Sequence, residues 1–150
     1  MKQAIQKIEE LINKGENWFS NHPESATELP IAPGKWSKKQ ILGHLIDSAI
    51  NNLQRFTEIG YQPQPYIYRP YNQTELVAAN QYQSAKIKEL LPLWISLNKQ
   101  IKRVMESQTE ERLKLKIQLD ENSFTDLRFI MMDYPEHLEH HVNQLTIDNE

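Results

Sequence analysis

Apolar side chains recur along this chain at intervals of three and four residues, the spacing that places them on one face of an α-helix. Ile5, Ile8 and Ile12 show this spacing near the start of the chain. The helices predicted in this way span about residues 2–19, 38–59, 73–105 and 124–147. No internal repeat or domain boundary interrupts the 150 residues, so we predict a single domain, residues 1–150. The fold class is all-α, a four-helix bundle with long loops between the helices.

Short local patterns predict where helices begin and where they are interrupted. Ser37 and Gln40 have the spacing of a capping box, in which each side chain bonds the other residue's backbone N–H. Residues 123–126 (SFTD) fit the same pattern before the last helix. Pro92 is expected to kink the third helix or mark a break in it. Residues 112–120 (RLKLKIQLD) alternate like a strand, and without an evident partner strand we interpret them as an extended connector.

Charge and composition argue against several classes of protein. The net charge of −3, with no long run of one sign, predicts no electrostatic binding to nucleic acid. No apolar run reaches the roughly 18 to 20 residues that a membrane span needs, and the first helix carries charges throughout, unlike a signal peptide. The chain has no cysteine, which excludes disulfides, thiolate ligands and a cysteine nucleophile. We therefore expect a cytoplasmic protein that contacts neither membrane nor nucleic acid.

The segment HLEHHVNQ near the C-terminus contains a candidate pair of metal ligands. His137 and His141 are four residues apart, so their imidazoles are neighbours on one face of a helix and could bind one ion. His140 points away from this face, and Gln144 lies at its edge. Histidines at the surface of an ordinary helix show the same spacing, so the pair alone is a weak signal. Pro135 leaves the continuity of this helix open, although both histidines follow it in one register.

A third ligand would have to come from elsewhere, and His44 in the second predicted helix is the candidate. It lies nearly opposite the apolar stripe, on the side that carries Ser48 and Arg55. This polar side is either a solvated face or the lining of a cleft, and the spacing alone favours the solvated face. Asp47, about one turn from His44, could orient its imidazole, join it as a ligand, or be an ordinary surface charge.

Two segments together resemble a known family. KWSKKQILGHLIDSAINNLQRF is similar to the first signature of the DinB/YfiT-like superfamily, and HLEHHVNQ is similar to its closing HxxxHxxQ signature. The resemblance extends from about residue 35 to residue 145. It implies a four-helix bundle of DinB/YfiT type in which His44, His137 and His141 hold a divalent metal. Asp47 and Gln144 match recurrent positions of the two signatures without being expected ligands.

The resemblance further implies a metal-dependent enzyme that acts on a small molecule. Zinc, nickel and iron all accept three nitrogen ligands. Members of the family resemble either hydrolases or transferases that use a low-molecular-weight thiol such as bacillithiol, and here any thiol must come from a cofactor because the chain has no cysteine. We assign Asp47 as the catalytic base or as a residue that orients a ligand, and we assign Arg55 and Gln144 to substrate binding.

A different class of protein remains open at this point. The chain could be a non-catalytic helical bundle, a binding or stress-related protein whose histidines form a structural or vestigial metal site. The family resemblance implies a homodimer for either interpretation. A general acid or base beside an open metal position would favour the enzyme, whereas a metal site blocked by side chains would favour the binding protein.

Overall fold

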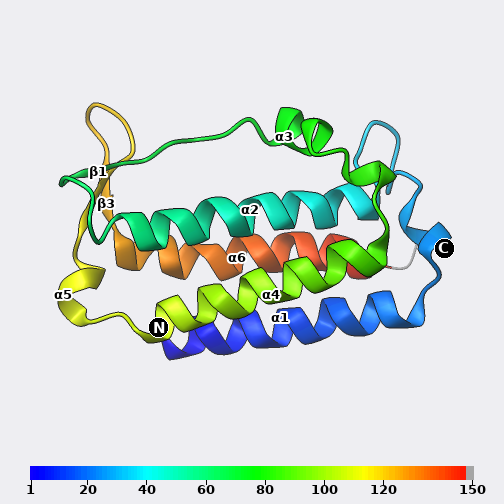
Figure 1. Ribbon diagram of the computed structural model, residues 1–150, viewed down its shortest axis with the longest axis horizontal. Coiled ribbons are helices and arrows are strands. Elements are labelled where there is room, and N and C mark those ends of the chain that lie inside the picture. The colour runs from blue at the N-terminus through cyan, green and yellow to red at the C-terminus, as the bar shows by residue number, and fades with distance from the viewer. Residues whose placement is uncertain (148–150) are drawn as a thin grey trace.

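The computed structural model describes residues 1–147, in which four long helices lie side by side. They are α1 (Lys2–Asn21), α2 (Lys38–Glu58), α4 (Ile87–Glu106) and α6 (Leu127–Thr146). Helices α1 and α6 run in one direction along the bundle, and α2 and α4 run in the other (Figure 1). α2 packs against α4 and α6, and α1 packs against the same two helices. The predicted all-α four-helix bundle is therefore confirmed.

A long crossover explains why α2 and α4 are parallel. The chain leaves the end of α2 and runs back along that helix before α4 begins (Figure 1). This crossover contains β1 (Tyr66–Ile67), α3 (Gln73–Ala79) and the short 3₁₀ helix η2 (Tyr82–Ser84). The predicted third helix, about residues 73–105, is interrupted between α3 and α4 rather than at Pro92. The helix stops where Gln81 adopts a left-handed backbone conformation, with φ of 54°.

Pro92 does not cause this interruption. It lies inside α4, which continues past it without a break. As the sixth residue of α4, Pro92 removes one helical hydrogen bond, the one that an N–H at this position would donate to the carbonyl oxygen of Lys88, and the helix continues on its remaining bonds. The segment between α1 and α2 is also a loop, as predicted, with one 3₁₀ turn, η1 (Glu24–Thr27).

A small three-stranded sheet closes one end of the bundle, beside the short helix α5 (Glu110–Leu113). Its central strand β2 (Lys116–Gln118) pairs in parallel with β1 and antiparallel with β3 (Phe124–Asp126). The interpretation of residues 112–120 as an unpaired connector is therefore wrong. The partner β1 has only two residues and comes from the crossover, so no local pattern announced it.

The helices that carry the candidate ligands have well-defined ends. The capping box of Ser37 and Gln40 is present at the start of α2. The predicted capping box of residues 123–126 is wrong. Residues 124–126 form β3, and the side chain of Asp126 caps α6 by accepting from the backbone N–H of Phe129. Pro135 is buried within α6, and the helix continues through it.

Lys38 connects the start of α2 to the end of α6. Its ammonium donates to the carbonyl oxygen of Leu145 at 2.9 Å and to that of Ile147, and it lies 4.3 Å from the centre of the Trp18 ring. A cation at the C-terminal end of a helix is stabilised by the carbonyl groups there. None of the helices within residues 1–147 is long and apolar enough to cross a membrane.

Candidate metal centre

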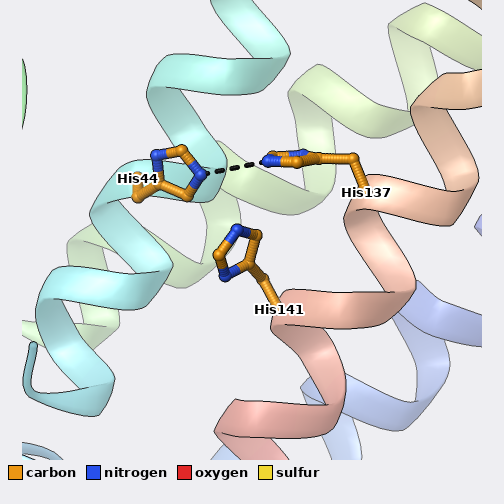
Figure 2. Close-up of side chains that lie close together, drawn as sticks. All are labelled: His44, His137 and His141. Atoms are coloured by element: carbon orange, nitrogen blue, oxygen red, sulfur yellow. Dashed lines mark hydrogen bonds between the residues drawn. The ribbon is translucent and has the colours of Figure 1, made fainter. Parts of the chain in front are cut away.

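Three histidines from two helices converge inside the bundle. His44 of α2 and His137 and His141 of α6 point toward one another (Figure 2). The Nε2 atoms of His44 and His137 are 3.2 Å apart, and one ring nitrogen from each of the three residues lies within 4.8 Å of the others. The side chain of His44 is completely buried. The solvated-face interpretation of His44 is therefore wrong, because its ring lies against Trp36 and against His137 and His141 of α6.

Hydrogen bonds on the outer side of the rings orient two of these imidazoles. The Nδ1 of His141 is 2.8 Å from the amide oxygen of Gln144. An amide oxygen can only accept, so the proton lies on Nδ1 and the Nε2 of His141 keeps its lone pair. The hydroxyl of Ser48 lies 3.4 Å from the Nδ1 of His137. Both contacts leave the Nε2 atoms free to face the centre of the cluster.

The environment of the cluster keeps the rings uncharged. Burial, together with the neighbouring imidazoles, lowers the pKa of His44 to about 3. Burial likewise lowers the pKa of His141 to about 4, with further lowering from His137 and His140. The pKa of His137 is also lowered, mainly by burial. Histidine binds metal only as the neutral ring, so these three side chains are in the required form at neutral pH.

The spacing of the nitrogens suits a divalent transition metal. Two nitrogens that are each about 2.0–2.1 Å from a tetrahedral ion lie about 3.3 Å apart. The separation of 3.2 Å between the Nε2 atoms of His44 and His137 is close to that value. Three neutral imidazoles also leave the charge of the ion uncompensated and a further coordination position available. The residues present therefore fit a metal of the zinc, nickel or iron type.

Asp47 is buried beside the cluster but faces the crossover. One carboxylate oxygen accepts from the hydroxyl of Tyr82 at 2.6 Å and from the side-chain amide of Asn80 at 2.8 Å. The other oxygen, Oδ2, is buried and has no hydrogen-bond partner among residues 1–147. Burial raises the pKa of Asp47, although the two hydrogen bonds oppose that shift. None of its hydrogen bonds within the described chain is to a histidine ring.

A pocket of about 210 Å³ extends from the histidine cluster between α2 and α6. Its residues come from one face of each helix and from the crossover: Ser48, Asn52, Arg55, Tyr68, Pro70, Tyr71, Gln73, Ile130, Asp133, Tyr134 and His137. Arg55, predicted to bind substrate, is buried in its wall, with its guanidinium 4.1 Å from the centre of the Tyr68 ring. Sequence reasoning missed Gln73 as a pocket residue, because nothing local to it shows that the crossover returns over α2.

Gln144, the other predicted substrate contact, lies on a different side of the cluster. Together with Trp36 it lines a second pocket of about 290 Å³. The Trp36 ring lies 5.2 Å from the His44 ring, centre to centre. The hydrogen bonds of Gln144 within the described chain are to His141 and, at 3.4 Å, to His140. Its position therefore suits it to orient the imidazole of His141, and its contact with substrate stays a prediction.

Comparison with known proteins finds one matching family model and several solved structures with a similar fold. The family model described as the DinB superfamily matches residues 8–145. YfiT from Bacillus subtilis, described as a probable metal-dependent hydrolase with an unusual four-helix bundle topology, superposes with a TM-score of 0.85. The two sequences are 23% identical, and the match covers 97% of this chain and 83% of YfiT. No curated protein matches the chain at a significant level.

Two structures of a mycothiol-dependent maleylpyruvate isomerase have a similar fold. One is of a histidine-to-alanine variant, with a TM-score of 0.76 at 10% identity, covering 98% of this chain. The other has a TM-score of 0.72 at 12% identity and covers 96% of this chain. This chain spans only 61% and 60% of those longer chains. At such identities the likeness concerns the fold alone.

Proposed function

The chain belongs to the DinB superfamily, and from this premise we propose that it is a divalent-metal-dependent enzyme acting on a small molecule. The observation that carries the proposal is the convergence of His44, His137 and His141 at the end of a pocket. These three side chains would hold the ion through their Nε2 atoms. The candidate metals are zinc and nickel, followed by iron. All three accept nitrogen ligands.

A divalent metal bound there would supply Lewis acidity, which promotes the deprotonation of water or of a thiol near neutral pH. The protein's own residues prepare for this by keeping the imidazoles neutral and oriented. Gln144 fixes the tautomer of His141, and Ser48 lies beside the Nδ1 of His137. Burial of His44 excludes bulk water from its side of the cluster.

For Asp47 we propose the role of a base that acts through a water molecule. Its raised pKa makes the carboxylate a better proton acceptor near neutral pH. Tyr82 and Asn80 hold one oxygen in place, and the other has no partner within residues 1–147. A carboxylate fixed at one oxygen and unpaired at the other is suited to receive a proton. The substitution Asp47→Asn keeps both hydrogen-bonding positions and removes this basicity.

We further propose that the substrate occupies the pocket beside His137 and contacts Arg55. Gln144 would contact the substrate only if the substrate also enters the second pocket. Two reactions fit the site. One is hydrolysis, the activity ascribed to YfiT. The other is transfer of a low-molecular-weight thiol of bacillithiol type, in keeping with the thiol-dependent isomerase that shares the fold. We propose a homodimer on the strength of the family resemblance.

The proposal is tested by assaying tag-free protein with one model substrate for each reaction. Ester hydrolysis is followed with a chromogenic aryl ester, and thiol transfer is followed as loss of an aromatic electrophile in the presence of a monothiol. Zinc-loaded and nickel-loaded protein are each compared with protein stripped by a chelator. His137→Ala is expected to abolish turnover, and His140→Ala is the matched control because His140 is exposed on the same helix.

Turnover that requires the metal and His137, but not His140, would support the enzyme. The reaction that responds would decide between hydrolase and transferase. Metal binding without turnover of either substrate class would instead favour the non-catalytic bundle, in which the histidines serve a structural site. Turnover that persists after chelation would contradict a metal-dependent reaction altogether.

A further inference from the structure

We propose that Arg55 forms a subsite for a terminal oxyanion of the ligand, a carboxylate or a phosphate, in the pocket that leads away from the histidine cluster, about two helical turns along α2 from Ser48. This inference deepens the proposed function and rests on it for the assignment of the pocket to substrate. It assigns a chemical class and an approximate length to the ligand: an elongated molecule whose reacting group lies at His137 and whose anionic end lies at Arg55.

The charge of Arg55 is buried without a counter-charge. Only 5% of the residue is exposed. Its hydrogen bonds within the described chain go to neutral acceptors, the carbonyl oxygen of Arg69 at 2.7 Å and the side-chain oxygen of Asn52 at 3.4 Å. No ion pair of Arg55 is present within residues 1–147. A buried charge is costly unless it is paired, so a ligand anion would supply the missing partner.

Neighbouring aromatic rings hold the guanidinium in a fixed orientation. It lies 4.1 Å from the centre of the Tyr68 ring and 5.6 Å from that of Tyr71. An arginine fixed in this way loses little conformational freedom when it binds an oxyanion, and its planar fork matches the geometry of carboxylate and phosphate. The arrangement therefore suits recognition of an anion better than a mobile surface lysine would.

The pocket leads from this guanidinium to the histidines. Ser48, Asn52 and Arg55 follow one another at helical spacing on the same face of α2, and all three line the pocket. Ser48 marks the inner end, since its hydroxyl is 3.4 Å from the Nδ1 of His137. Arg55 follows Ser48 by seven positions, so their Cα atoms lie about 10 Å apart along the helix axis. An extended ligand with about six methylene groups between a terminal sulfur and a terminal carboxylate would span that distance.

One carboxylate also lines the pocket, and its position limits its effect. Asp133 is exposed at the rim, where water and salt screen its charge. Arg55 is buried, where its charge acts through a lower dielectric. The net preference of the inner pocket is therefore for an anion. Asp133→Asn is expected to raise the affinity for an anion, whereas Arg55→Gln is expected to lower it.

The first experiment uses metal-free protein, so that it is independent of catalysis. Binding of heptanoate, pentyl phosphate and 1-heptanol is measured by ligand-observed NMR for the wild type, Arg55→Gln, Arg55→Lys and Arg103→Gln. Arg103 is an exposed arginine on α4 outside the pocket and serves as the matched control. We expect at least one of the two anions to bind the wild type about tenfold more tightly than heptanol.

Arg55→Gln is expected to lose that preference, Arg55→Lys to keep part of it, and Arg103→Gln to keep all of it. The responding anion identifies carboxylate or phosphate as the ligand end. Equal binding of anions and heptanol to the wild type would overturn the inference, even if Arg55→Gln failed to fold. An identical anion preference in folded Arg55→Gln, verified by circular dichroism, would overturn it as well.

The second experiment tests the distance with nickel-loaded protein. Binding of 3-mercaptopropionate and 7-mercaptoheptanoate is followed by the absorption of the thiolate–nickel pair. The longer probe is expected to bind about tenfold more tightly, and Arg55→Gln is expected to remove the difference. Equal affinity of both probes for the wild type would overturn the distance assignment. Failure to bind nickel would count against the proposed function, whereas the metal-free titration would still decide the anion subsite.

Discussion

Acidification should destabilise the metal-free protein through His44. The pKa of this ring falls from its ordinary value of 6.5 to about 3 in the folded chain because the ring is buried. Below pH 6.5 the unfolded chain therefore takes up a proton at His44 that the folded chain does not. Protons bound only by the unfolded state favour unfolding, so the free energy of unfolding must fall as the pH falls from about 7 toward 3.

The size of the effect follows from the two pKa values. Between pH 7.5 and pH 5, the difference in proton binding at His44 lowers the free energy of unfolding by about 2 kcal/mol. With a urea dependence of about 2 kcal/mol per molar, the midpoint of unfolding should shift by about 1 M. The assay is urea denaturation at pH 7.5, 6.0 and 5.0 in the presence of a chelator, comparing wild type with His44→Gln.

The variant should lose about 2 kcal/mol of the pH dependence shown by the wild type, because glutamine does not titrate. Asn143→Gln, which exchanges one exposed side chain of α6 for another that does not titrate, is the control and should retain the wild-type dependence. An equal pH dependence in the wild type and His44→Gln would refute the reasoning, since it would mean that the folded chain accepts a proton at His44 as readily as the unfolded chain.

Three further substitutions test individual contacts. Gln144→Leu removes the acceptor for His141 and should weaken metal binding about 10- to 100-fold in a competition titration with a fluorescent chelator, whereas Gln144→Glu keeps an acceptor and should bind at least as well as wild type. Lys38→Met removes a cation that bonds the end of α6 and should lower the free energy of unfolding by about 2 kcal/mol in urea denaturation; no change would mean that this contact does not stabilise the fold. Gly43→Ala places a Cβ against the Tyr82 ring, so the free energy of unfolding should fall by about 1–3 kcal/mol in thermal denaturation, and an unchanged melting temperature would contradict this packing.

Local sequence patterns predicted the elements that depend on neighbouring residues. The spacing of Ser37 and Gln40 located the start of α2, and the capping box is present there. The spacing of His137 and His141 predicted two imidazoles on one helix face, and they are neighbours in the structure. In each case the interacting groups lie within four residues of one another on one helix, so the sequence spacing alone determines that they are neighbours.

Features that depend on distant segments could not be predicted in this way. The helical position of His44 indicated a polar face, but its burial depends on Trp36 and on α6, which is some ninety residues away in the sequence. The pairing of β2 likewise depends on a two-residue strand some fifty residues earlier. The histidine triad was predicted from the family resemblance and not from the spacing alone. The contact of Arg55 with the Tyr68 ring depends on the path of the crossover, which no local pattern predicts.

The central claim is that His44, His137 and His141 bind one metal ion. The direct measurement is the metal content of protein purified without a histidine tag, by mass spectrometry, for the wild type, His44→Ala, His141→Ala and the control His140→Ala. The account predicts about one transition-metal ion per chain in the wild type and the control, and loss of that ion in the other two variants. No metal after zinc and nickel are offered, or metal retained in both His44→Ala and His141→Ala, would contradict it.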